Sequence, residues 1–277
     1  MCLIVLAWRA HPRYRLIVAA NRDEYFTRPS STAGFWEEPP HVLAGRDLEA
    51  GGTWLGITVQ GRFAALTNYR NPADKRPLAP SRGALVSGFL GGTVGPHQYL
   101  KSVDKRAADY NGFSLLVGDP ESLCFFSNRG GPVTRVKPGV HGLSNHLLDT
   151  PWPKITKSKN WLTAHLEAPL DVQAAFRLLD DRERAPNGEL PSTGVGLELE
   201  ERLSAIRIPA EGGYGTRCST VLAFGNDGRV EFHERSFRED GGASGTVSYR
   251  FTVDRRKAPA SSPRVESRLP KTPLPAR

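Results

Sequence analysis

The sequence predicts an α+β fold in which helices pack against antiparallel sheets. Segments with strand and helix character follow one another as strands, helices, strands, helices, strands, whereas a doubly wound parallel sheet would alternate strand and helix strictly. Short turns rich in Gly, Asp or Asn separate several neighbouring strand segments, as in hairpins and meanders. With 277 residues, the chain is long enough to bury a sizeable core.

The first third of the chain predicts two hairpins joined by a long loop. Apolar runs at 2–8 and 16–20 form the first hairpin, and strand-like segments at 53–59 and 62–68 form the second. The stretch 22–52 contains three prolines and clustered Ser, Thr and Gly, so it is predicted as a loop.

The rest of the chain predicts helices and strands in separate groups. The middle holds a helix capped by Ser81, a second helix at 96–108, and a strand meander at 113–118, 122–127 and 133–136. The later part holds helices at 153–166 and 172–180, a short helix within 197–206, and strands at 216–224, 230–237 and 247–253.

Charge is concentrated at the C-terminus. The chain carries a net charge of +8, and the segment 254–277 alone has seven basic and two acidic residues, so the preceding 253 residues carry only +3. This segment is rich in Pro and Ser and nearly without apolar residues, which predicts a disordered basic tail after one folded domain at 1–253. A basic tail also suggests nucleic-acid binding, but a solvated terminus explains it more simply, and no nucleic-acid partner is expected.

Composition and cysteine use favour a reducing compartment. Hydrophobic residues make up 39% of the chain and charged residues 24%, which is typical of a globular chain and not of a membrane bundle. Cys2, Cys124 and Cys218 are too few and too scattered for a disulfide scaffold or a zinc site. The first apolar run lacks a basic region before it, and no run reaches the roughly 18 apolar residues of a membrane span. We therefore expect a cytoplasmic protein without a membrane span.

Common catalytic motifs are absent from the sequence. It contains no phosphate loop, no dinucleotide-binding glycine motif, no His-Glu-x-x-His and no Gly-x-Ser-x-Gly. His141 and His146 are the closest pair of histidines, and we interpret them as loop imidazoles near a turn.

Cys2 is the first residue that indicates chemistry. Met1 is normally removed when the next residue is small, and Cys2 would then carry a thiol and a free α-amine with a pKa near 7.7–8.0. Such an amine can take the thiol proton, and the thiolate is a nucleophile. Alternatively, Cys2 is a small hydrophobic residue that begins a buried strand.

The motif Asn21-Arg22-Asp23-Glu24 closes the second predicted strand. If the first two strands form a hairpin, Arg22 and Asp23 lie near Cys2. The guanidinium would favour the thiolate, and Asp23 could hold the α-ammonium group. The alternative is a solvated turn with a surface ion pair.

Three more polar residues are candidates for a site. Asn68 and Asn145 end apolar segments, where an amide can donate to an oxyanion or simply form a turn. Arg217 begins a predicted strand, where its side chain could face a site or lie at the exposed edge of a sheet.

Together, these motifs resemble those of the NRDE family, which is also called the transport and Golgi organisation protein 2 family. The similarity extends to about Phe237 and leaves the basic tail outside, and Cys218 stands where Ser is usual. The motifs are Met1-Cys2, Asn21-Arg22-Asp23-Glu24, Gly51-Gly52-Thr53-Trp54-Leu55-Gly56, Ser81-Arg82-Gly83, Asn111-Gly112-Phe113, Gly142-Leu143-Ser144-Asn145, Asp149-Thr150-Pro151-Trp152-Pro153-Lys154 and Thr216-Arg217.

The resemblance implies a four-layer αββα sandwich of antiparallel sheets, as in N-terminal nucleophile (Ntn) hydrolases such as choloylglycine hydrolases and penicillin acylases. Those enzymes use an N-terminal Cys, an Arg and an Asp after the second strand, two Asn and a later Arg. The residues in comparable positions here are Cys2, Arg22, Asp23, Asn68, Asn145 and Arg217. Arg22 and Asp23 are adjacent, which departs from the spacing in those enzymes.

Two functions follow as hypotheses. The first is hydrolysis of amide or thioester acyl bonds by Cys2, without a cofactor. The second is a carrier that uses the same pocket for haem or an amphipathic lipid, because family members are associated with haem mobilisation and with lipid or acyl-CoA metabolism. For haem as a cargo, the candidate ligands are Cys2, His141 and His146.

Overall fold

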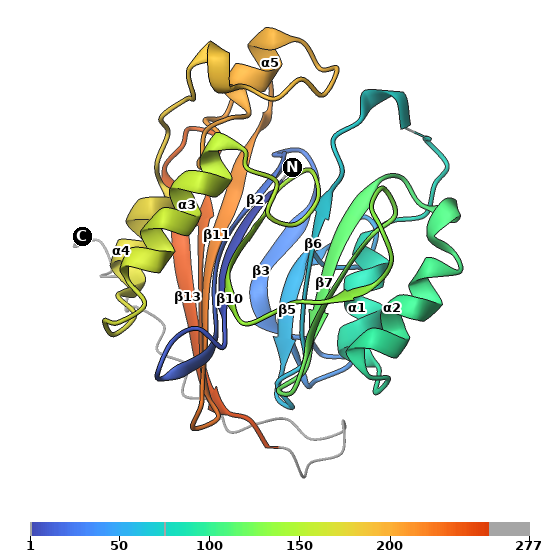
Figure 1. Ribbon diagram of the computed structural model, residues 1–277, viewed down its shortest axis with the longest axis vertical. Helices are drawn as coiled ribbons and strands as arrows, with labels where there is room; N and C mark the ends of the chain where they lie inside the picture. Colours follow the sequence, from blue (N-terminus) through green and yellow to red (C-terminus); the bar gives the residue numbers. More distant parts are fainter. Residues whose placement is uncertain (1, 75, 255–277) are drawn as a thin grey trace, which may run out of the picture.

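Two antiparallel sheets lie face to face at the centre of the computed structural model, and a pair of helices covers the outer face of each (Figure 1). The structure describes residues 2–74 and 76–254. Over these residues the order of layers is helix, sheet, sheet, helix, and the predicted αββα sandwich is confirmed.

The first sheet has six strands and carries α3 and α4 on its outer face. In spatial order its strands are β10 (Gly139–Leu143), β1 (Cys2–Trp8), β2 (Tyr14–Tyr25), β11 (Tyr214–Gly225), β12 (Arg229–Phe237) and β13 (Ala243–Thr252). Its helices are α3 (Pro153–Ala164) and α4 (Val172–Leu179).

The second sheet has seven strands and carries α1 and α2. Its strands are β3 (Ser30–Phe35), β4 (Val42–Asp47), β5 (Leu55–Thr58), β6 (Phe63–Asn68), β7 (Phe113–Gly118), β8 (Leu123–Ser127) and β9 (Thr134–Arg135). The remaining elements are α1 (Gly83–Gly91), α2 (Pro96–Asp104), α5 (Leu197–Arg202) and 3-10 turns at Pro72–Asp74, Ala107–Asp109 and Asn187–Glu189.

β1 shows why the inner strands read as continuous apolar runs. Ile4 and Leu6 point into the core between the sheets, whereas Leu3 and Val5 belong to the core under α3 and α4. Because both faces of this sheet are covered, nearly every position of the strand must be apolar. β1 and β2 therefore form the predicted hairpin at the centre of a buried sheet.

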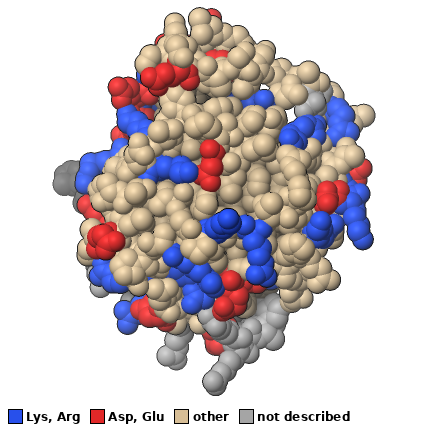
Figure 2. Space-filling model, viewed as in Figure 1, with Lys and Arg blue, Asp and Glu red and all other residues tan. Residues whose placement is uncertain are grey.

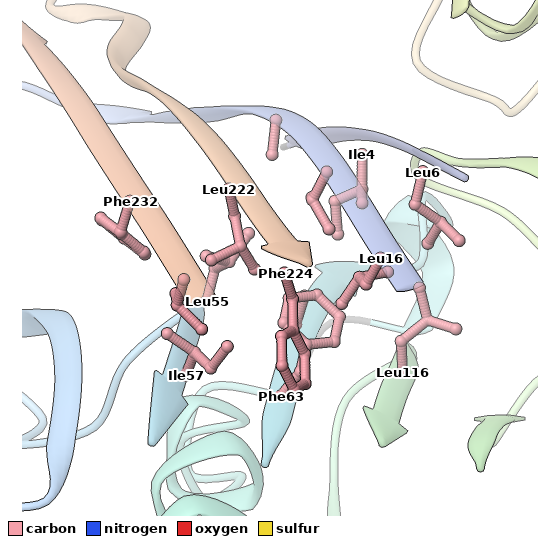
Figure 3. Packing of buried hydrophobic residues seen from close by; sticks show 14 of the residues in the cluster. Ile4, Leu6, Leu16, Leu55, Ile57, Phe63, Leu116, Leu222, Phe224 and Phe232 are labelled. Carbon is pink, nitrogen blue, oxygen red and sulfur yellow. The ribbon is translucent and has the colours of Figure 1, made fainter. Parts of the chain in front are cut away.

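Large side chains from both sheets fill the space between them (Figure 3). Leu222 and Phe232 of the six-stranded sheet pack in one buried cluster with Ile57 and Phe63 of the other. These four side chains are at most 2% exposed. This core fixes the two sheets against each other, so residues at the strand ends are held in place.

The prediction of a loop at 22–52 is wrong. β2 continues to Tyr25, and β3 and β4 follow as strands. β3 lies at the edge of its sheet, and its side chains are mostly partly exposed, so its sequence lacks the alternation that identifies a strand. Strand pairing with β4 stabilises it despite a poor local signal.

The ends of several helices also differ from those that the sequence predicts. Ser81 does not cap α1, because the helix starts after Arg82 and no side chain caps it. The helix predicted at 96–108 ends at Asp104 and is followed by a 3-10 turn, and the helix predicted within 197–206 spans only Leu197–Arg202.

The predicted tail at 254–277 lies outside the described residues except for Asp254, so the domain boundary stays a prediction. In the part of the chain that the structure describes, no helix is both long and apolar enough to cross a membrane. On the face shown in Figure 2, basic side chains lie beside acidic ones.

Candidate functional site

The β1–β2 hairpin places Cys2 directly opposite Arg22. On the other side of β2, Arg22 is paired with Cys218 and Asp23 with Thr216 of β11. The polar motif after the apolar part of β2 therefore meets the start of β1, as the hairpin prediction requires. Cys2 and Cys218 flank Arg22 from two strands that are not neighbours, and both thiols are free.

A cavity of about 350 Å³ opens beside Cys2 at this end of the sandwich. Four of the predicted site residues line it together: Cys2, Arg22, Asp23 and Asn68. The other walls come from the 24–28 and 47–54 segments, the 77–83 segment, Leu66 and Asn111. Asn145 and Arg217 are not among the lining residues.

Glycines allow the walls of the cavity to approach each other. A Cβ atom on Gly52 would lie 2.5 Å from the backbone carbon of Gly83, which is far too close. The Gly51–Gly56 and Ser81–Gly83 motifs therefore pack backbone against backbone. This contact brings Arg82, which precedes α1, into the wall of the cavity that Trp54 of the other motif also lines.

Cys2 is partly exposed in the cavity wall, yet burial raises the pKa of its thiol. The charge of the N-terminal amino group lowers this pKa, the Asp23 carboxylate raises it, and Arg22 lowers it by a smaller amount. Arg22 thus favours the thiolate, as expected, but its effect is too small to lower the pKa of Cys2 overall. Desolvation outweighs the nearby positive charge, so the resting group is a thiol.

Asp23 is almost completely buried in β2, beside Thr216 of β11. Its Oδ1 atom accepts a hydrogen bond of 2.6 Å from the Thr216 hydroxyl. Burial raises the pKa of Asp23, and the charge of Lys154 acts in the opposite direction. Asp23 is 1% exposed, so it is not part of the solvated turn that was the alternative interpretation.

Lys154 was not predicted as a site residue. It lies in the first turn of α3, is 3% exposed, and donates a hydrogen bond of 2.9 Å to the Leu203 carbonyl. Burial lowers the pKa of Lys154 to about 8, although the charge of Asp23 counteracts this shift. Lys154 is the last residue of the Asp149–Lys154 motif, which is the signal that could have identified it.

Asn68 and Asn145 occupy different positions. Asn68 ends β6 and lines the cavity. Asn145 is fully buried behind it, and its Nδ2 atom donates a hydrogen bond of 2.9 Å to the Asn68 carbonyl. Ser144, the neighbour of Asn145, donates from its hydroxyl to the Cys2 carbonyl at 2.9 Å. This segment therefore fixes the backbones of both Cys2 and Asn68.

Arg217 lies outside the cavity and holds the turn after β2. Its Nη1 atom donates to the carbonyls of Tyr25 and Arg28 at 2.7 and 2.9 Å. Arg28 in turn lies in the cavity wall, where it forms an ion pair with Asp47 at 2.9 Å. Arg217 thus influences the site by positioning this turn.

A buried ion pair connects the site region to α5, which rises above the sheets at the top of Figure 1. Arg70 and Glu200 form this pair, and the Arg70 guanidinium also lies over the Trp152 ring at 4.8 Å. Glu200 additionally accepts a hydrogen bond of 2.7 Å from the Thr193 backbone. No motif or spacing predicts this contact, because the two partners are far apart along the chain.

The interpretation of His141 and His146 as loop imidazoles is wrong for His141, which lies in β10. The Nδ1 atom of His141 is 2.7 Å from Asp149, and its Nε2 atom is 2.9 Å from the Lys137 carbonyl. His146 contacts the Tyr69 hydroxyl at 2.7 Å and the Thr150 hydroxyl at 2.9 Å through its two ring nitrogens. Both rings therefore have structural partners at each nitrogen.

Sequence comparison identifies the family once this geometry is known. The model of the family described as Transport and Golgi organisation 2 matches residues 1–239. The chain belongs to this family. The human Transport and Golgi organization protein 2 homolog is 39% identical over 279 residues, which cover 91% of this chain and 99% of the relative. The Drosophila melanogaster protein of the same name is 28% identical and covers 85% of this chain.

Solved structures similar to this member of the Transport and Golgi organisation 2 family have the Ntn-hydrolase fold. The C2A mutant of the conjugated bile acid hydrolase from Clostridium perfringens matches with a TM-score of 0.50 and 9% identity, over 100% of this chain and 99% of that enzyme. A Caenorhabditis elegans ortholog of N-acylethanolamine-hydrolyzing acid amidase matches with a TM-score of 0.47 and 10% identity, over 80% of this chain and 92% of that enzyme. The similarity to the bile acid hydrolase concerns the fold, and it agrees with the resemblance found in the sequence.

Proposed function

We propose that this protein hydrolyses amide or thioester acyl bonds with Cys2 as the nucleophile. The observation that carries the proposal is the position of Cys2, which lines a cavity together with Arg22, Asp23 and Asn68 at the end of the central hairpin. A Cys that only packed in the core would have no reason to share a cavity with these polar groups.

The proposed reaction begins from the neutral thiol. After removal of Met1, the α-amine of Cys2 accepts the thiol proton while the sulfur attacks the acyl carbonyl carbon. The tetrahedral intermediate expels the amine or thiol leaving group, which takes the proton from the α-ammonium. Water then attacks the resulting thioester with the same amine as the base, and this step releases the carboxylic acid and restores the thiol.

Neighbouring residues support each step. The Asn68 amide can donate to the oxyanion, and Asn145 positions the Asn68 backbone from behind. Asp23, fixed by Thr216, provides the negative charge that stabilises the α-ammonium group. The raised pKa of the Cys2 thiol makes such a base necessary, because little thiolate is present near neutral pH.

The fold is consistent with this chemistry. The bacterial structure that matches the whole chain is a conjugated bile acid hydrolase, studied as a C2A mutant. At 9% identity, this match supports a shared scaffold, and the proposed role of Cys2 in this chain rests on its own cavity.

Intact mass spectrometry with acyl-thioester and activated-amide substrates tests the proposal. The purified protein should lack Met1 and should gain one acyl mass on the peptide that begins with Cys2. Cys2→Ala should abolish the adduct and turnover, and Cys2→Ser should reduce turnover by orders of magnitude. Cys218→Ser is a matched control, because this buried cysteine lies on the other side of Arg22, and the variant should keep wild-type turnover.

Two results would contradict the proposal. Retained Met1 would remove the free amine that the mechanism needs. Equal turnover in the wild type and in Cys2→Ala would show that Cys2 is not the nucleophile. In either case, titration with haemin and with an amphipathic lipid tests the carrier hypothesis, for which a sharp, shifted Soret band is the expected sign of haem ligation.

A further inference from the structure

The cavity beside Cys2 is lined by three arginines, Arg22, Arg28 and Arg82. These arginines differ in the groups that they contact. Arg28 is neutralised, because it forms ion pairs of 2.9 Å with both Asp47 and Glu49. Together the three groups carry a net charge of −1, so Arg28 offsets these two carboxylates only in part.

Arg22 and Arg82 form no ion pair with a carboxylate in the described part of the chain. The Arg22 guanidinium stacks over the Trp54 ring at 4.2 Å, and its one polar contact is a long one of 3.5 Å to the Ser30 hydroxyl. Among the residues that the structure describes, the Arg82 side chain donates only to the Gly112 carbonyl, at 3.0 Å. A guanidinium has five N–H donors, so most donors of both residues remain for a ligand.

The other carboxylates of the cavity do not change this conclusion. Asp23 accepts the Thr216 hydroxyl and faces the charge of the buried Lys154. Glu24 accepts the backbone N–H of Tyr25 at 2.9 Å, and its charge acts on Arg82 without forming a hydrogen bond to it, so the guanidinium donors stay available. The first turn of α1, which begins directly after Arg82, adds the positive end of its dipole to the same wall.

We propose that Arg22 and Arg82 form an anion-binding subsite that takes a carboxylate or phosphate group on the leaving-group side of the acyl substrate. This inference rests on the proposed function, since Cys2 defines where the acyl carbon lies. A second, apolar space lined by Cys2, Ile4 and Leu55 measures only about 10 Å³. That is about the room one water needs, so the ligand must occupy the polar cavity.

Binding to the Cys2→Ala protein tests the subsite without turnover. Three ligands share an eight-carbon chain: N-octanoylglycine carries a carboxylate, octyl phosphate carries a phosphate, and N-octanoylglycine methyl ester is uncharged. By calorimetry, we expect at least one of the two anions to bind about tenfold more tightly than the ester, because a hydrogen bond to a charged group is worth at least that factor. The tighter of the two anions identifies which group the subsite prefers.

Arg82→Gln keeps a donor for the Gly112 carbonyl but removes the charge. In the Cys2→Ala background it should lose about tenfold in affinity for the preferred anion, while affinity for the ester should change less than about twofold. Arg82→Lys should retain a preference for the anion. Arg76→Gln is the matched control, because Arg76 is exposed, does not line the cavity, and also donates to carbonyls of this segment, those of Ala108 and Tyr110.

Equal affinities for the two anions and the ester would overturn the proposal, as would equal losses in Arg76→Gln and Arg82→Gln. Failure of the hydrolase proposal would give a different set of results from failure of the anion subsite. In that case the wild type forms no acyl adduct with any substrate, while the Cys2→Ala protein still prefers the anion and loses that preference in Arg82→Gln.

Discussion

Cys2 shows how burial and access act separately on one residue. The side chain reaches a cavity, so reagents can approach it, but the loss of water around the sulfur raises the thiol pKa. Cys124 and Cys218 are buried at 0% and 5% exposure, and burial also raises their pKa values. Reactivity among the three cysteines therefore depends first on access.

We predict that iodoacetamide alkylates Cys2 faster than Cys124 or Cys218, and that the rate keeps rising with pH beyond about 8.5, the ordinary pKa of a cysteine. A raised pKa means that less thiolate is present near pH 7 and that its fraction grows only at higher pH. Asp23→Asn should shift the profile to lower pH, because the Asp23 charge raises the pKa of Cys2. Arg22→Gln should shift it to higher pH. Peptide mass spectrometry after timed alkylation measures these rates.

A plateau in the rate of Cys2 alkylation near pH 7 would contradict the prediction. It would mean that the thiolate is stabilised after all, as the sequence alone suggested. Similar rates at Cys2 and Cys124 would instead show that the cavity does not admit the reagent.

At the residue level, the sequence predicted the part of the site that depends on local geometry. Cys2 and Arg22 face each other because a hairpin register follows from the apolar runs of its two strands. Lys154 and Arg82 reach the same site from α3 and from the start of α1. Their positions depend on how helices pack on separate sheets, which no local pattern encodes.

Glycines allow strands and helices of this fold to pack closely against each other. Gly142 of β10 faces α3, and a Cβ atom there would lie 2.6 Å from Cγ2 of Ile155. The strand therefore supports the helix that carries Lys154 at its start. Asp149 also connects β10 to α3, because its carboxylate accepts hydrogen bonds from the Gly142 backbone at 2.9 Å and from Lys159 at 2.6 Å.

We predict that Gly142→Ala destabilises the protein by about 1–3 kcal/mol, because the added methyl group must push α3 away from β10. Gly131→Ala is the control, since a Cβ there meets nothing within 4 Å and its φ lies outside the left-handed region. This change should stay within about 0.5 kcal/mol of the wild type. Urea unfolding followed by circular dichroism measures both. Equal stability of the two variants would show that α3 adjusts freely.

At the element level, predictions failed where pairing outweighs local sequence. β10 contains two glycines and a histidine in five residues, yet it forms a strand because it extends the sheet beside β1. β3 and β4 form strands in a region rich in Pro, Ser and Gly for the same reason. The central strands were predicted well, because burial on both faces gives them continuous apolar runs.

The two sheets of the whole molecule depend on each other through the core between them. β13 lies at the edge of the six-stranded sheet and pairs with β12, but it also reaches across to the other sheet. The Tyr249 hydroxyl donates to the Ala33 carbonyl of β3 at 3.0 Å, and Phe251 is 7% exposed within the shared core. An edge strand with these contacts is part of the folded domain.

We predict that a chain ending at Asp254 melts in one cooperative transition at the wild-type temperature, whereas a chain ending at Gly242, without β13, does not. The second truncation removes four side chains that pack on the central core, Val247, Tyr249, Phe251 and Val253. Full burial of one such side chain is worth about 1.5–3 kcal/mol, and a domain has only about 5–15 kcal/mol of stability in total. Calorimetry compares the two truncated chains with the full protein. Loss of cooperative melting in the longer chain would place the domain boundary beyond Asp254, and wild-type melting of the shorter one would mean that the sandwich does not need its edge strand.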